Sequence, residues 1–351
     1  MLYDYQGNKL KPYPTIVGDG VTDDTNALQA IVNANKSIHL QSGLKIKLTS
    51  PIYINIDNCD VFDGGNSILI IDGDFAAFEI SGSLTSSMTA NPSTLNESIV
   101  QNEASFHFVN TKITAKDETK GIGISISGCF KTYIEGCYIY KVSVGIAIKN
   151  QNRDINISNN QIYGCWLYGI HIQNTVNLHQ FNLNGNMISY CYYCIYLDNP
   201  VQIANWQCTG NDIEISTYPT VSDKTGFKAI NIDSGNTQSG QLSEIEICGN
   251  TIQGHSISTE IIAISGGTNR YVQHLSVTGN HISNANANLI SLNKVKTASF
   301  CGNTYKDATT CIFNLINCDR ITIVGESGNN VGSLINADSD CTNIINANNN
   351  V

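Results

Sequence analysis

The amino-acid sequence predicts an all-β protein, a right-handed single-stranded parallel β-helix with three short strands per coil. Two phrases recur along most of the chain, and apolar and polar residues alternate inside each phrase, which is typical of strands. A coil takes about two dozen residues, so the 351 residues form about nine or ten coils. Strands this short bury a common core only when the coils stack. We divide the chain into an N-terminal segment with a capping helix, residues 1–50, and a β-helix body, residues 51–351.

The first phrase places a Gly-Asn pair between two strands and reads apolar-x-apolar-x-Gly-Asn-x-Ile. Asn tolerates the left-handed conformation that a tight corner needs, and its amide can bond to the same Asn one coil away. We therefore interpret these Asn residues as a structural ladder and not as sugar ligands. The copies lie at 181–188, 245–252 and 275–282, with variants at 132–139, 155–162, 206–213 and 298–305.

The second phrase is an Ile-x-Ile strand that precedes the first phrase in each coil. Its alternation predicts that the Ile and Leu side chains point into the coil and that the residues between them point outward. The first five copies begin 22 to 35 residues apart, and a further copy follows later in the chain. They lie at 123–126, 145–148, 169–172, 194–197, 229–232 and 289–292.

Residues 18–32, with the sequence GDGVTDDTNALQAIV, predict a short helix. Asp23 and Asp24 would lie in its first turn, where negative charge is favourable. The apolar face of the helix would cover the open first coil, whose strand edges are otherwise unpaired. That face consists of Leu28, Ile31 and Val32.

The segment 18–32 resembles the entry motif of the pectate-lyase-like β-helix superfamily, best known in phage tailspikes and capsule depolymerases. The repeats extend this resemblance to most of the chain. It implies a depolymerase that acts at the bacterial cell surface as part of a phage tail, as a homotrimer. The polygalacturonase pattern of related β-helices is absent, because Asn174 and Thr175 are followed by Val176 and no Asp-Asp pair occurs in a central coil.

The composition excludes several classes of partner. Only 14% of the residues are charged, the net charge is −10 and the pI is about 5.1. Binding to nucleic acids or to anionic membrane surfaces requires basic residues, so we expect neither partner. No apolar run has the length of a membrane span. The N-terminus lacks the basic and apolar regions of a secretory signal, which predicts folding in a cytoplasm.

The twelve cysteines do not indicate a disulfide scaffold, because a chain of this length builds a core without one. Cys191 and Cys194 have CxxC spacing but no second pair, and the histidines show no metal-ligand spacing. We expect reduced, mostly buried cysteines, no metal site and no cofactor.

The outward residues of the Ile-x-Ile strands supply the candidate catalytic site. Asp198 and Asp233 fall in one column on neighbouring coils, with His171 beside them. The strand spacing of about 4.8 Å suits the two carboxyl groups of a retaining glycosidase, and a wider, inverting arrangement is equally open if the side chains diverge. Close like charges would also raise the pKa of one carboxyl group, which supplies an acid beside an ionised nucleophile. The structural alternative is a solvated surface pair, or a pair neutralised by Lys149 or Lys228.

The candidate substrate-binding residues are aromatic, amide and hydroxyl side chains near this pair. Aromatic faces stack on sugar rings, and amides and hydroxyls bond to sugar hydroxyls. Two insertions, residues 217–226 and 234–241, are expected to wall a groove. The residues are Tyr196, Asn231, Gln173, Trp166, Tyr168 and Tyr193.

A second acidic set provides an alternative catalytic site. Glu246 projects outward from the strand before the Gly-Asn corner, and Asp212 and Glu214 project from the strand after that corner one coil earlier. Glu244 accompanies them.

Three functions fit these residues. The first is hydrolysis of a bacterial surface polysaccharide, such as a capsule, O-antigen or exopolysaccharide, by the Asp198–Asp233 pair. The second is a lyase on an acidic glycan, with His171 or Tyr196 as the base and a cation to neutralise the uronate. The third is a non-catalytic β-helix that binds a glycan or receptor, or that only builds a tail.

Overall fold

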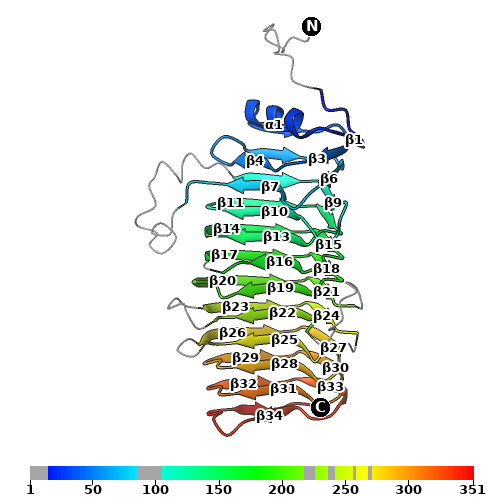
Figure 1. Ribbon diagram of the computed structural model, residues 1–351. Coiled ribbons are helices and arrows are strands. Elements are labelled where there is room, and N and C mark those ends of the chain that lie inside the picture. Colours follow the sequence, from blue (N-terminus) through cyan, green and yellow to red (C-terminus); the bar gives the residue numbers. More distant parts are fainter. Residues whose placement is uncertain are drawn as a thin grey trace.

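The protein is a stack of coils, seen in a computed structural model that describes residues 15–84, 105–174, 176–216, 226–235, 242–255, 258–267 and 271–351. One helix lies at the N-terminal end and the coils follow one another down a single column to the C-terminus (Figure 1). Strands of neighbouring coils pair in parallel, as between β13, β16 and β19. The chain is therefore the right-handed parallel β-helix that its repeats predict.

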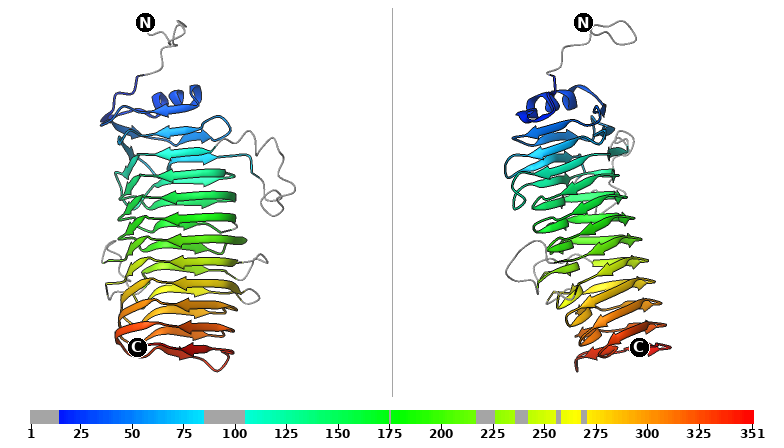
Figure 2. Two further views of the ribbon diagram at one scale, coloured as in Figure 1. Left: turned by 180° about the vertical axis from the view of Figure 1, so that it is seen from behind. Right: turned by 90° about the vertical axis from the view of Figure 1, so that its right-hand side faces the viewer.

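Each coil contributes one strand to each of three sheets, and strands of one sheet lie above one another in every view (Figure 2). The Ile-x-Ile strands form sheet I, the strands before the Gly-Asn corner form sheet II, and the strands after it form sheet III. Sheet I contains β4 (Ile52–Asn55), β7 (Ala76–Ser81), β10 (Ile122–Ser127), β13 (Val144–Lys149), β16 (Tyr168–Ile172), β19 (Tyr193–Asp198), β22 (Lys228–Asp233), β25 (Glu260–Ser265), β28 (Asn288–Asn293), β31 (Cys311–Ile316) and β34 (Ile335–Ala337).

The other two sheets run alongside sheet I for the length of the column. Sheet II contains β2 (Ser37–His39), β5 (Val61–Asp63), β8 (Phe106–Val109), β11 (Phe130–Glu135), β14 (Gln151–Ser158), β17 (Asn177–Asn184), β20 (Gln202–Thr209), β23 (Leu242–Cys248), β26 (Val272–Thr278), β29 (Ala298–Cys301), β32 (Ile321–Val324) and β35 (Ile345–Ala347). Sheet III contains β1 (Asp19–Asp23), β3 (Lys45–Leu48), β6 (Ile68–Ile71), β9 (Lys112–Ala115), β12 (Tyr138–Tyr140), β15 (Gln161–Tyr163), β18 (Met187–Ser189), β21 (Asp212–Glu214), β24 (Thr251–Gln253), β27 (His281–Ala285), β30 (Thr304–Ala308) and β33 (Ser327–Val331).

The described residues form 12 strands in sheet II, 12 in sheet III and 11 in sheet I, more than the nine or ten coils expected. The difference comes from coils at both ends whose sequences depart from the repeated phrases. In one C-terminal coil, for example, Glu326 takes the position that Asn303 has in the preceding coil. The first strands also lie before residue 51, because β1, β2 and β3 already pair with strands of the following coils.

The helix α1 (Thr25–Ala34) covers the N-terminal end of the column, with Leu28 and Val32 buried against the first coils. Asp23 and Asp24 precede the helix and do not lie in its first turn, in contrast to the expectation. The Asp24 carboxylate is buried and accepts the backbone N–H groups of Val17 and Gly18 at 2.7 and 2.9 Å. The acidic motif thus fixes the entry of the chain, because backbone donors surround its carboxylates.

The predicted Asn ladder is present at the corner between sheets II and III. Each Asn Nδ2 donates to the Oδ1 of the Asn in the next coil at 2.9–3.0 Å. Every member is buried and also donates to a backbone carbonyl or receives a backbone N–H group. The members are Asn160, Asn186, Asn211, Asn250, Asn280 and Asn303.

The left-handed residue at this corner is not the ladder Asn, as the sequence suggested, but the residue before it. Gly185, Gly210 and Gly249 have φ values of 63–64°, and Asn159 takes this position with a φ of 55° in its own coil. Glycine therefore makes the bend, and the Asn that follows is free to bond along the axis.

The interior of the column is apolar, and the cysteines belong to it as expected. Inward Ile, Leu and Phe side chains of successive coils form one continuous cluster with the fully buried Trp206. All twelve cysteines are free thiols, and nine of them are buried. No helix in the described part of the chain is long and apolar enough to cross a membrane.

The Asn ladder ends on a buried carboxyl group. Asn303 Nδ2 donates to Glu326 Oε1 at 3.2 Å, and Glu326 is only 1% exposed. Its other oxygen, Oε2, has no hydrogen-bond partner among the described residues. Burial therefore raises the pKa of the Glu326 carboxyl group, although Tyr305 and Asn303 oppose that shift.

We predict that this carboxyl group makes the C-terminal coils less stable as the pH rises. Because its pKa is raised in the folded chain, the folded state binds the proton more tightly than the unfolded state, so stability falls from about pH 4.5 through the raised pKa. Glu326→Gln should remove this slope and be more stable at neutral pH by about 1 kcal/mol or more. Urea unfolding between pH 4 and pH 8 measures this pH dependence of the free energy of unfolding. Asp340→Asn, a change at an exposed carboxyl group, is the control. An unchanged slope in Glu326→Gln would contradict the assignment.

Candidate functional site

The strand register aligns the candidate catalytic residues on neighbouring strands of sheet I. His171, Tyr196 and Asn231 are register partners on β16, β19 and β22. Asp198 and Asp233 are partners at the ends of β19 and β22. Neighbouring strands lie about 4.8 Å apart, so both carboxyl groups project from adjacent coils next to one another.

Two side chains approach Asp198. Tyr196 Oη donates to Asp198 Oδ1 at 3.5 Å, and His171 Nε2 lies 3.7 Å from Asp198 Oδ2. The imidazole belongs to the preceding coil and is 11% exposed, whereas the Asp198 side chain is 38% exposed. The three groups therefore converge at the surface, with the carboxylate as the most accessible of them.

The surroundings keep the imidazole and the phenol uncharged at neutral pH. Burial lowers the pKa of His171, and the nearby Asp198 carboxylate only partly opposes this shift. Burial also raises the pKa of Tyr196 strongly, and the charges of Asp198 and Asp233 add to it. The pKa of Tyr168 rises for the same two reasons, burial and Asp198. The site therefore offers a neutral base and protonated hydroxyl groups beside a carboxylate.

Four rings form an aromatic platform on this face, defined as Tyr168, His171, Tyr193 and Tyr196. Tyr168 lies 4.1 Å from the His171 ring and 5.3 Å from the Tyr196 ring, measured between centroids. Tyr193 stacks on Tyr196 at 4.9 Å. Rings at these distances attract one another, so the platform is held in place before any ligand binds.

The other expected binding residues take different positions. Asn231 continues the Tyr196 column, and Gln173 lies in the turn directly after β16. Trp166 lies in the turn before β16 and makes no ring contact with another described residue. Of the two expected insertions, residues 217–225 and 236–241 lie outside the described residues.

Asp233 and the neighbouring lysines have partners of their own. Asp233 Oδ1 accepts the backbone N–H of Gly235 at 2.9 Å, which fixes the carboxyl group at the end of its strand. Lys149 Nζ lies 3.3 Å from Glu79, and Lys228 Nζ lies 2.8 Å from Glu260. Both cations that a lyase would use on a uronate are thus paired with glutamates.

The structure divides the second acidic set between two sheets. Asp212 and Glu214 lie on β21 in sheet III, whereas Glu246 lies on β23 in sheet II. Glu214 Oε1 contacts His255 Nε2 closely. Burial and the charge of Glu214 raise the pKa of Asp212. His255 was not identified from the sequence as part of this acidic set, because it lies in the turn after β24, the next strand of sheet III, and not at a strand position.

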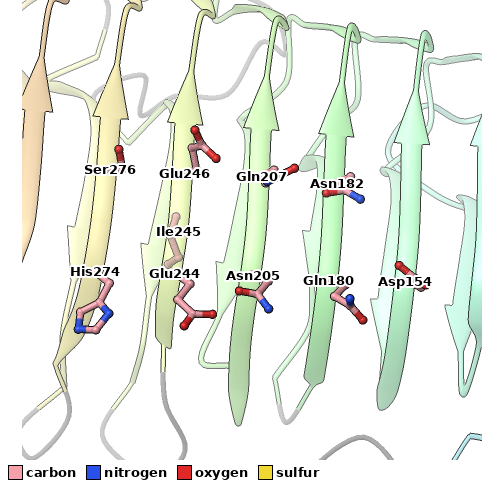
Figure 3. A pocket seen from close by; sticks show the side chains of 10 residues that line it. All are labelled: Asp154, Gln180, Asn182, Asn205, Gln207, Glu244, Ile245, Glu246, His274 and Ser276. Atoms are coloured by element: carbon pink, nitrogen blue, oxygen red, sulfur yellow. The ribbon is translucent and has the colours of Figure 1, made fainter. Parts of the chain in front are cut away.

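Glu246 instead lines a polar groove of about 650 Å³ on the outer side of sheet II (Figure 3). The groove spans five coils, from β14 to β26, and two rows of side chains line it. One row is Asp154, Gln180, Asn205, Glu244 and His274, and the other is Asn182, Gln207, Glu246 and Ser276, with Ile245 between them. Sequence reasoning identified the two glutamates but not the groove.

The comparisons with known proteins agree on the fold. The structure is similar to the Streptococcus pneumoniae surface protein and adhesin PfbA, at 11% identity and a TM-score of 0.53, over 96% of this chain and 97% of that one. It is similar to the tailspike of E. coli bacteriophage HK620 in complex with a pentasaccharide, at 11% identity and a TM-score of 0.54, over 94% of this chain and 66% of that one. The chain is a right-handed parallel β-helix.

A third similar structure is the catalytic unit of a GH87 α-1,3-glucanase from Streptomyces thermodiastaticus, at 12% identity and a TM-score of 0.50, over 95% of this chain and 67% of that one. The chain thus spans about two thirds of the tailspike and of the glucanase. An adhesin, a tailspike and a glucanase share this fold, so the fold does not decide the function.

A family model described as periplasmic copper-binding protein (NosD) matches residues 64–237. A search of curated protein sequences found no match. The described residues contain no group of three or more His, Cys, Asp or Glu side chains that is arranged to hold a metal ion.

We predict that His171 titrates below the ordinary range for histidine. Burial disfavours the charged ring, and Asp198 is the group that counteracts it, so Asp198→Asn should lower the pKa of His171 further. Two-dimensional NMR of the histidine ring nitrogens over pH 4 to 8 measures both values. The exposed His281, on sheet III, serves as the internal reference. A pKa of His171 that rises in Asp198→Asn would contradict the geometry.

Proposed function

We propose that the protein is a polysaccharide depolymerase that hydrolyses glycosidic bonds of a bacterial surface polysaccharide with Asp198 and Asp233. The observation that carries this proposal is the register pairing of the two carboxyl groups on β19 and β22, beside the aromatic platform. A strand spacing of about 4.8 Å brings them near the separation of about 5–5.5 Å that retaining glycosidases use.

The contacts of the pair suggest a division of roles. Asp198 receives the Tyr196 hydroxyl group, which holds its carboxyl group at the end of the aromatic platform. Asp198 therefore acts as the nucleophile that attacks the anomeric carbon. Asp233 then protonates the leaving oxygen and later activates the water that releases the sugar.

The aromatic platform would position the sugar over the carboxyl pair. Tyr168 and Tyr193 lie at the start of their strands, and Tyr196 lies in the middle of β19. The rings therefore form a row on sheet I that ends at Asp198. Stacking fixes the sugar plane, and Asn231 adds an amide for sugar hydroxyls. The low charge of the chain suits a neutral or weakly charged glycan.

The test is release of reducing ends from purified bacterial capsules, O-antigens and exopolysaccharides. The wild type should release them, and Asp198→Asn and Asp233→Asn should each lose about 10²-fold or more of the rate. Asp57→Asn, a change at an exposed turn carboxyl group, is the matched control and should retain full activity.

The other outcomes separate the alternatives. Products that absorb in the ultraviolet as unsaturated uronates would indicate the lyase. A neutral His171 beside Tyr196 favours that reaction, whereas the pairing of Lys149 and Lys228 with glutamates opposes it. Release that survives both substitutions would move the active site to Asp212 and Glu214. Glycan binding without release from any polymer would indicate a binding protein.

In this proposal the protein works in a phage tail as a homotrimer. The similarity of the fold to a phage tailspike supports this arrangement, and the polar, weakly charged outer faces allow coils of three chains to lie side by side. Sedimentation equilibrium of the whole chain should therefore give three times the mass of 38.1 kDa. A mass of one chain over a wide concentration range would rule out the trimer.

A further inference from the structure

We propose that the groove on sheet II is a second carbohydrate-binding site, which holds an extended neutral glycan along the axis of the β-helix. The groove lies on a different sheet from Asp198 and Asp233. Its function therefore does not depend on the hydrolysis proposed above.

The hollow arises from a bend that is repeated at one position of sheet II. The residues of the first row all have left-handed backbones, with φ values of 53–60°. Each of these strands therefore bends at the same place, and the sheet folds along a line parallel to the axis. None of the five is glycine, although a left-handed backbone disfavours most side chains. These residues are Asp154, Gln180, Asn205, Glu244 and His274.

The second row comes from the strand position two residues later, where the register aligns one side chain from each coil. Asn182 pairs with Gln207, Gln207 with Glu246, and Glu246 with Ser276. Figure 3 shows both rows, which run side by side along the sheet. The groove therefore offers a pair of polar side chains in four of its five coils, at intervals of about 4.8 Å. This interval is close to the length of one sugar unit in an extended chain.

The middle of the groove carries hydrogen-bonding groups that no protein side chain uses. The side chains of Asn205, Gln207 and Glu246 make no hydrogen bond or ion pair with another described residue. An amide offers donors and acceptors together, and a carboxylate accepts. Sugar hydroxyls also donate and accept, so they can satisfy both kinds of group at once.

The charge of the groove selects against acidic glycans. Asp154, Glu244 and Glu246 are acidic, and the described residues that line the groove include no Lys or Arg. The carboxylates would repel uronates, phosphates and sialic acids, whereas they accept hydroxyl and N-acetyl N–H donors from a neutral chain. Among the residues of the lining that the structure describes there is no Tyr, Trp or Phe, so recognition through them depends on hydrogen bonds.

The experiment counts bound oligosaccharides by native mass spectrometry. The parent protein carries Asp198→Asn and Asp233→Asn, so that the probes remain intact. The probes are hexasaccharides of glucose, mannose, galactose and N-acetylglucosamine, with hexagalacturonate as the acidic comparison. Ser276→Trp fills the groove. Ser299→Trp is the matched control, because Ser299 is the register partner of Ser276 one coil further and does not line the groove.

We expect the parent to bind at least one neutral hexasaccharide more tightly than hexagalacturonate. Ser276→Trp should bind one ligand fewer per chain, and Ser299→Trp should match the parent. Gln207→Ala, which keeps the backbone and removes one amide, should weaken binding about 3- to 10-fold, as loss of one hydrogen bond does. This milder change keeps the test valid if the Trp variant folds poorly.

Three results would overturn the proposal. The first is that Ser276→Trp binds as many ligands per chain as the parent. The second is that the parent binds hexagalacturonate more tightly than every neutral hexasaccharide, and the third is that it binds no neutral probe. Failure of the hydrolase proposal gives a different result, because wild-type protein would then bind neutral glycans in the groove without releasing reducing ends. Each proposal can therefore be disproved without disproving the other.

Discussion

Hydrogen bonding along the axis is the constraint on which the rest of this structure depends. Each coil is too small to bury its own apolar side chains, so every coil needs the one above and below it in a fixed register. The Asn ladder enforces that register at the corner between sheets II and III, because an amide that slipped by one residue would be buried without a partner. The columns on all three outer faces follow from this alignment.

The alignment explains why acidic residues far apart in sequence become neighbours. Asp198 and Asp233 lie far apart in sequence, with an insertion between them, yet the register pairs them on β19 and β22. The same coils carry Asp212 and Glu214 on sheet III and Glu244 and Glu246 on sheet II. These two coils thus carry acidic side chains on all three sheets, while their interior is as apolar as that of the other coils.

Much of this arrangement could be predicted from the sequence, since the alternation of apolar and polar residues and the two repeated phrases can be read from it directly. The Ile-x-Ile phrase fixed which residues face outward, and the columns of His171 and Asp198 followed by counting. The groove could not be predicted in this way. Its bend depends on left-handed backbones at Gln180, Asn205 and Glu244. None of these residues is glycine, and polar residues of the same kinds stand at many other positions of the chain, so the sequence does not reveal the bend. His255 was missed because a turn, and not a strand position, brings it to Glu214.

The amide ladder also has a direction. Every Asn donates its side-chain hydrogen toward the C-terminal end, and from Asn186 onward each also receives one from the preceding coil, so each bond polarises the next in the same sense. Glu326, which receives the last of these bonds, ends the series with a group that need not donate. The interior members are therefore interchangeable, and only the terminal members are special. A β-helix of this kind can gain or lose whole coils from its middle by duplication or deletion, with the chemistry of both ends unchanged.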